Sequence, residues 1–173
     1  MGGVLENLMR DLPSALAADV VALRLVRYKL PIGLLSVLDA SFFRKSGEDT
    51  VGSLMARANL LRSVANHATD RRIVENFSEL FRLADGSTIG VKNFEAIWII
   101  LDLPGSWTNV PEDSLLVREI TAKRNDVAHW LSDPVDTGRS KRPSGLIQMI
   151  DQLIGLLDHV QLNLCYWLEG RAE

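Results

Sequence analysis

Apolar residues recur in this sequence at alternating steps of three and four residues, which is the spacing of one face of an α-helix. The pattern predicts helices over residues 14–30, 32–43, 51–83 with a bend at 66–70, 91–103, 109–130 and 144–168. No segment alternates between apolar and polar residues as a half-buried strand would. We therefore expect an all-α fold, an up-and-down bundle of about five to seven helices. Residues 1–173 should form a single domain, because no linker is long enough to divide them.

The same spacing indicates which side chains fill the interior. The last helix should turn these residues inward: Ile147, Ile150, Ile154, Leu157 and Leu164. Three tryptophans, Trp98, Trp107 and Trp167, are expected in the core or in a dimer seam, and His67 at the surface or at a boundary between helices.

Composition narrows the class of protein. With 47% hydrophobic and 24% charged residues, the chain has the profile of a soluble globular domain and not of a disordered one. A formal net charge of −3 argues against a protein that binds nucleic acid over its whole surface, so any contact with phosphate needs a local basic patch. A lone cysteine, Cys165, and the lack of a signal peptide or a long apolar span predict a cytoplasmic protein without a membrane segment.

The residues that point to chemistry lie late in the penultimate helix. Arg124 is a permanent cation, Asn125 follows it, and His129 can exchange protons near neutral pH. Cleavage of RNA without a metal needs a base that takes the proton of the ribose 2′-hydroxyl and a cation that holds the phosphate as negative charge develops on it. The segment therefore predicts a metal-independent ribonuclease site.

Helix geometry supports part of this prediction. Asn125 and His129 are four residues apart and share a helix face. Arg124 lies about 140° around an ideal helix from His129, so the two side chains would not meet in the middle of a helix. A distorted last turn would bring them together, and so would a second copy of the helix across a two-fold axis. We favour the homodimer, because it also doubles the number of cations at the site.

The segment 124–129 resembles the R-x4-6-H motif of HEPN domains, in the form that carries Asn after the Arg. The stretch 115–120 before it and the long apolar helix after it are also similar to that family, and the resemblance covers residues 91–169. It implies a HEPN-like helical bundle that dimerises through its motif helices. It further implies an endoribonuclease that leaves 2′,3′-cyclic phosphate and 5′-hydroxyl ends, with no cofactor and no metal.

Residue roles follow from the same resemblance. Arg124 would bind the scissile phosphate, Asn125 would position it and His129 would transfer protons. Many members of the family are toxins of toxin–antitoxin or antiviral defence systems, which implies RNA as substrate and an antitoxin or another neutralising protein as partner. Trp130 departs from the pattern, because glycine is frequent at that position; its ring would narrow the cleft, stack on a base or pack against the protein.

The basic residues near the motif have two interpretations. Lys123, Arg139, Lys141 and Arg142, together with Trp130, would grip the RNA backbone or its bases. Residues 139–142 are equally interpreted as a solubilising loop, and Glu119 as an ordinary helix partner of Lys123.

The motif itself also has a second interpretation. Arg124 would then pair with a carboxylate and His129 would end the helix, where a cation is favoured, and the chain would be a non-catalytic dimerisation or regulatory module. The three histidines and the cysteine have no metal-ligand spacing, and no glycine-rich phosphate loop is present.

Overall fold

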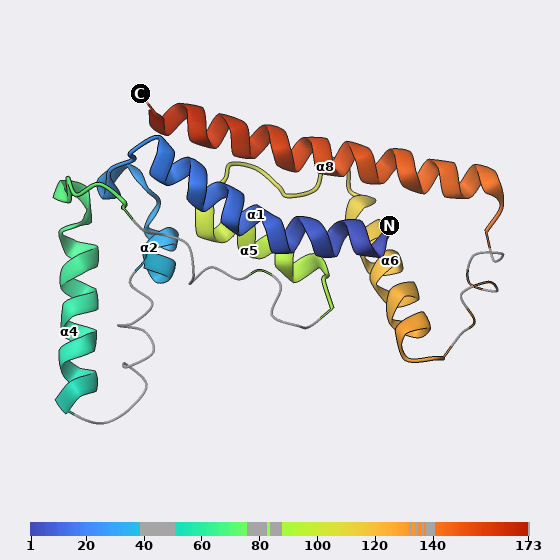
Figure 1. Ribbon diagram of the computed structural model, residues 1–173, viewed down its shortest axis with the longest axis horizontal. Helices are drawn as coiled ribbons and strands as arrows, with labels where there is room; N and C mark the ends of the chain where they lie inside the picture. Colours follow the sequence, from blue (N-terminus) through green and yellow to red (C-terminus); the bar gives the residue numbers. More distant parts are fainter. Residues whose placement is uncertain are drawn as a thin grey trace.

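A 30-residue helix, α8 (Pro143–Ala172), runs along the length of the molecule, with α1 (Gly2–Ala22) beside it (Figure 1). The computed structural model describes residues 1–38, 51–75, 83, 88–131, 133, 135, 137 and 141–172. Between these two helices in the chain lie η1 (Arg27–Lys29), α2 (Ile32–Leu38), α4 (Val51–Ala65), η2 (His67–Thr69), α5 (Val91–Leu101) and α6 (Asp113–Ala128). The predicted all-α fold is confirmed: the described residues form six α-helices and no strand.

The core lies between α1, α2, α5, α6 and α8. Its most deeply buried hydrophobic side chains are Leu5, Met9, Val20, Leu34, Phe94, Ile97, Leu101, Val117, Leu156 and Val160. As predicted, three tryptophans belong to it. Trp107 stacks on Phe94 with 5.1 Å between ring centroids, and the indole N–H of Trp167 donates to the carbonyl of Leu101 at 2.7 Å.

The inward face of α8 differs from the prediction. The buried stripe consists of Met149, Leu153, Leu156, Val160, Leu164 and Trp167. Of the residues expected inside, Leu164 is buried and Leu157 is partly buried, whereas Ile147, Ile150 and Ile154 are 58%, 45% and 51% exposed. The helix therefore carries two apolar stripes, and periodicity alone does not tell which one packs on the core.

The first predicted helix is displaced in the structure. Instead of spanning 14–30, α1 begins at Gly2, contains Pro13 and ends at Ala22. Arg24 then adopts a left-handed conformation with φ 51°, which turns the chain out of the helix. The following residues run beside 70–74, where the backbone N–H of Val74 donates to the carbonyl of Leu25 at 3.0 Å.

The helix predicted over 51–83 is also shorter than expected. It ends at Ala65, and Ile73 lies in extended backbone that forms a bridge with Val26. His67 is buried rather than at the surface, and its Nε2 lies 2.7 Å from the carbonyl oxygen of Leu30. Residues 39–50, 76–82 and 84–87, which include much of two predicted helices, lie outside the described part of the chain.

An ion cluster fastens the 70–74 segment to η1. The carboxylate of Asp70, only 12% exposed, accepts hydrogen bonds from Arg72 Nε at 2.8 Å and from Arg27 Nε at 2.9 Å. The side-chain hydrogen bond from Arg72 is the largest cause that holds the pKa of Asp70 well below its usual range, although burial acts in the opposite direction. The charged form of Asp70 is therefore part of the folded structure.

We expect Asp70→Asn to lower the free energy of unfolding by about 2–3 kcal/mol at pH 7, because two arginines lose a charged partner. A depressed carboxyl pKa stabilises the folded state above the unfolded pKa of about 3.9, and this contribution is lost as pH falls through the folded value. The difference between the variant and the wild type should therefore shrink below about pH 4.

Urea unfolding as a function of pH measures this effect. Asp11→Asn is the matched control, because Asp11 and its partner Arg10 are 71% and 67% exposed. That change should alter stability by less than about 1 kcal/mol. A loss at Asp70 that does not depend on pH would contradict the argument.

Candidate functional site

The candidate site lies on α6, which begins four residues later than predicted. The helix starts at Asp113 and not at Asn109, because the Asp113 carboxylate folds back onto the preceding loop. Its Oδ2 accepts the backbone N–H groups of Asn109 at 2.8 Å and Val110 at 2.9 Å, and its Oδ1 accepts Gln152 Nε2 of α8 at 3.1 Å. This buried carboxylate therefore fixes the first turn of α6 against α8.

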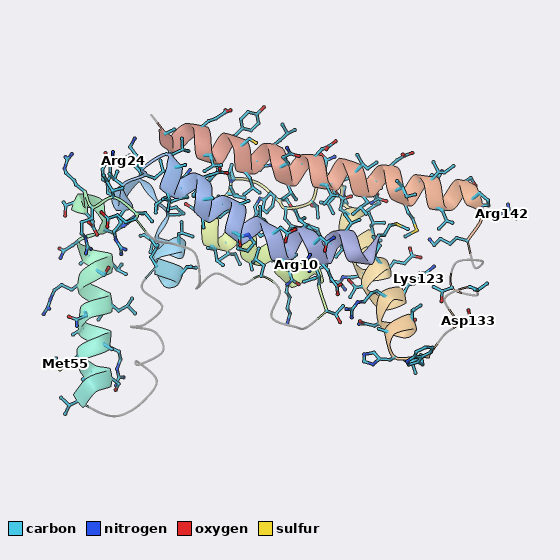
Figure 2. The ribbon with its side chains drawn as sticks, viewed as in Figure 1. Arg10, Arg24, Met55, Lys123, Asp133 and Arg142 are labelled. Atoms are coloured by element: carbon cyan, nitrogen blue, oxygen red, sulfur yellow. The ribbon has the colours of Figure 1, made fainter. Side chains whose placement is uncertain are left out.

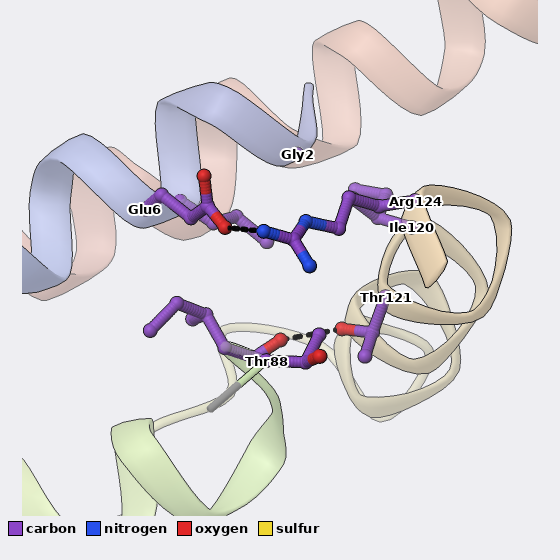
Figure 3. Close-up of a pocket in the computed structure, with 8 residues that line it drawn as sticks. Gly2, Glu6, Thr88, Ile120, Thr121 and Arg124 are labelled. Carbon is purple, nitrogen blue, oxygen red and sulfur yellow. Dashed lines mark hydrogen bonds and ion pairs between the residues drawn. The ribbon is translucent and has the colours of Figure 1, made fainter. Parts of the chain in front are cut away.

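Arg124 faces α1. Its Nη2 donates to Glu6 Oε1, and both side chains are 40% exposed (Figure 3). A Cβ added at Gly2 would lie 3.2 Å from Arg124 Cγ, so the first turn of α1 packs closely on the arginine stem. The cavity beside this pair has about 10 Å³, which is room for about one water molecule. Within one chain, the guanidinium is thus held by a carboxylate.

Asn125 is anchored next to Arg124. Its Oδ1 accepts the hydroxyl of Thr88 at 2.7 Å and, more weakly, Nη1 of Arg124 at 3.5 Å. One turn earlier, the Thr121 hydroxyl donates to the carbonyl of Ile89 at 2.7 Å. These two hydrogen bonds tie the middle of α6 to the segment before α5, so Asn125 is a positioned amide and not a mobile one.

The helix ends at the motif in a tight hydrogen-bonded turn. The backbone N–H of Trp130 donates to the carbonyl of Val127 at 3.2 Å, and that of Leu131 to the carbonyl of Asp126 at 2.8 Å. This pairing is the Schellman motif, which places the residue after the helix in the left-handed region. Trp130 occupies that place with φ 57°. Glycine is the residue that normally fills it, so the departure noted in the sequence has a backbone cost.

His129 and Trp130 follow the last turn of α6, and this end of the helix projects away from α1 and α8 (Figure 1). His129 is exposed, and Trp130 and Leu131 are 90% and 75% exposed. Within the described residues, no hydrogen bond joins the imidazole to Arg124 or Asn125. The structure therefore brings Arg124 and Asn125 together and leaves His129 apart from both.

The basic residues that were predicted to contact RNA fall into three groups in the structure. Lys123 and Lys141 both pair with Glu119, at 3.3 and 2.8 Å. The hydrogen bond from Lys141 is the largest cause that lowers the pKa of Glu119, and that from Lys123 also contributes. Arg142 is exposed, and Arg139 lies outside the described residues.

Sequence reasoning missed two partners of the motif, Glu6 and Thr88. Each contacts it from a segment far away in the chain, 118 residues before Arg124 and 37 before Asn125. Helical spacing reports only on neighbours within one helix, so no pattern in the sequence indicated either contact.

No protein-family model, curated protein or solved structure matches this chain. Among the helices of the described residues, none combines the length and the apolar character needed to cross a membrane. In that same part of the chain, no three histidine, cysteine or acidic side chains gather into a group that would hold a metal ion.

We expect Trp130→Gly to raise the free energy of unfolding by about 1 kcal/mol. The left-handed conformation costs a residue with a side chain about 1–2 kcal/mol, and the indole is too exposed to offset it by packing. Thermal or urea unfolding measures the gain. Leu131→Gly is the control, because Leu131 is also exposed but has no left-handed backbone; it should be neutral or destabilising. Equal effects of the two changes would contradict the argument.

Proposed function

We propose that this chain is a metal-independent endoribonuclease of the HEPN type that works as a homodimer. The observation that carries the proposal is the surface position of Arg124 and His129. Arg124 and His129 are accessible on the projecting part of α6, and neither is buried in the core. An RNA strand can therefore reach both side chains. The wider role, as a toxin or an antiviral defence effector with a neutralising partner, rests on the resemblance of residues 124–129 alone.

The proposed reaction is an internal transesterification. The ribose 2′-oxygen attacks the adjacent phosphorus, its proton passes to an imidazole, and the bond from phosphorus to the 5′-oxygen breaks. The leaving 5′-oxygen receives a proton, which yields a 2′,3′-cyclic phosphate and a 5′-hydroxyl. In a dimer the two His129 side chains share the two proton transfers, and Arg124 neutralises the charge that grows on the phosphate.

A second copy of the chain supplies the geometry that one chain lacks. Arg124 points toward α1 and His129 sits at the helix end, so the cation and the base belong to different surfaces of α6. A two-fold axis near these helices would let the cation of one protomer approach the base of the other. The dimer is thus part of the proposed mechanism.

The exposed stripe on α8 supports such a dimer. Ile147, Ile150 and Ile154 are about half exposed and follow a three- and four-residue spacing, as in the seam of a coiled coil. They lie in the half of α8 that begins beside α6, because Lys141, just before α8, pairs with Glu119. Pairing through this stripe would bring the motif helices of two copies near one another.

We expect His129→Ala and Arg124→Ala each to lower the rate of RNA cleavage by about 10²- to 10⁴-fold without unfolding the protein. Cleavage of a labelled RNA by purified protein, with a chelator present throughout, gives the measurement. The wild type should retain its rate with the chelator and leave cyclic phosphate ends. His159→Ala is the control, because His159 contacts Ser106 and Trp98 far from the motif, and it should cleave normally.

Normal cleavage by either motif variant, or none by the wild type, would contradict the proposal. The Glu6–Arg124 ion pair favours the alternative, a non-catalytic dimerisation or regulatory module in which Arg124 is structural. In that case Glu6→Gln and Arg124→Ala would lower stability by similar amounts that are not additive, and neither would affect RNA.

We expect Ile150→Asp to weaken dimerisation by at least about 100-fold. Each isoleucine buried in a two-fold interface counts twice, at about 1.5–3 kcal/mol per side chain. Sedimentation of the wild type should show a dimer and that of the variant a monomer, with cleavage lost in parallel. Ile99→Asp is the control, because Ile99 is 75% exposed on α5, outside the stripe. A monomeric wild type would rule out the dimer, and so would equal effects of the two changes.

A further inference from the structure

The end of the molecule opposite the motif is basic. Figure 2 shows Arg24 at one end and Lys123 and Arg142 at the other. Two pockets lie there, on either side of the segment that carries Arg71 and Arg72. One has about 410 Å³ and the other about 530 Å³. Of the described residues that line them, six are basic and one is acidic, although the whole chain has a net charge of −3.

Among the described residues that line the smaller pocket are four cations, Arg24, Lys29, Arg71 and Arg171, and no carboxylate. Lys29 donates to the backbone carbonyl of Arg171 at 3.3 Å, and the guanidinium of Arg71 lies 5.8 Å from the centre of the Tyr28 ring. Neither contact neutralises a charge. An anion that entered this pocket would therefore meet several cations that these contacts leave charged.

Arg171 adds a second observation. Its Nε is buried and has no hydrogen-bond partner, which is rare for a buried donor. Burial lowers the pKa of Arg171, and the nearby Asp102 only partly opposes this. A cation in that situation gains more from an anionic ligand than a fully hydrated one does.

The negative C-terminal ends of two helices offset only part of the positive charge in this pocket. α1 ends at Ala22 and α8 at Ala172, close to the pocket, and each helix C-terminus carries roughly half a negative charge. Two such ends amount to about one unit. Four full cations line the pocket, so a surplus of positive charge remains after the helix ends are matched.

The larger pocket continues the surface across the backbone. The described residues that line it include Arg62, Arg72, Asn59, Asn66 and Thr69, and the one acidic residue among them is Asp70. That carboxylate is already bound by Arg27 and Arg72. Arg71 lines the smaller pocket, and Arg72, the next residue, lines the larger one. The cations of the two pockets therefore form one stripe and not a single closed site.

We infer that this stripe, which we define as Arg24, Lys29, Arg62, Arg71 and Arg171, binds the phosphate backbone of single-stranded nucleic acid. Two adjoining basic pockets suit the successive phosphates of one strand better than they suit one isolated phosphate. Tyr28 adds an aromatic ring beside the cations, the combination that single strands use. A helix of 30 residues separates this surface from the motif end by about 45 Å. The inference does not depend on the proposed cleavage.

Fluorescence anisotropy with labelled single strands tests the inference in the full chain. Oligo-deoxythymidine is the first probe, because it lacks the 2′-hydroxyl and is not cleaved, and oligouridine with the His129→Ala variant is the second. We expect Arg62→Gln and Arg71→Gln to weaken binding by about three- to tenfold each, and more in combination. The slope of log affinity against log salt should fall by about 0.7 for each phosphate that the variant no longer neutralises. Both residues are exposed, so the fold should persist.

Arg10→Gln is the matched control, because Arg10 is exposed on α1 away from the stripe. Similar binding of the two probes would indicate recognition of the backbone alone, and stronger binding of oligouridine would add a contact to ribose. The inference is overturned by equal losses for Arg10→Gln and the stripe variants. It is also overturned by competition from inorganic phosphate or polyglutamate as strong as that from unlabelled oligonucleotide. Loss of cleavage with this binding intact would count against the proposed function only.

Discussion

Burial of one face of α8 over most of its length is the constraint on which the rest of the structure depends. From Met149 to Trp167 its inner stripe packs on the core, and each such side chain contributes about 1.5–3 kcal/mol when it leaves water. Because the buried stripe spans 19 of the 30 residues, the helix holds two distant parts of the molecule at a fixed separation. Helix α6, which carries the motif, contacts one end of α8. Arg171, which belongs to the basic stripe, lies near the other end. A shorter or frayed α8 would lose this relation.

The Glu6–Arg124 pair is the feature on which the two functional interpretations differ, and its magnitude helps to weigh them. An ion pair in which both side chains are 40% exposed contributes at most about 1 kcal/mol. A phosphate that offers charge-assisted hydrogen bonds to the same guanidinium can therefore displace Glu6 at little cost. The pair does not obstruct a phosphate-binding role for Arg124. It does explain why the side chain has a defined position in the single chain.

Helical spacing was sufficient to predict the class of fold and several elements, but not their packing. α5 and the core positions of Trp98 and Trp167 follow directly from apolar sequence, whereas Trp107 lies in a polar loop and its burial follows from its large apolar ring. The inner face of α8 did not, because Ile147, Ile150 and Ile154 repeat with the same period as the buried stripe. Which stripe is covered depends on the neighbouring helices, and these lie far away in the chain. The end of α1 was missed for a related reason, since no local signal marks Arg24 as left-handed.

The candidate site also divides into features that one helix predicts and features that depend on packing. Asn125 and the helix end were predictable from α6 alone, whereas Glu6 and Thr88 depend on how α1 and the segment before α5 pack against it. Charge gives the clearest case. A net charge of −3 was taken to oppose broad nucleic-acid binding, yet the average hides a basic stripe at one end. At physiological salt, exposed charges act over roughly 8 Å, far less than the length of α8. A strand at the stripe would therefore experience only the local cations, and the acidic residues elsewhere would not weaken its binding.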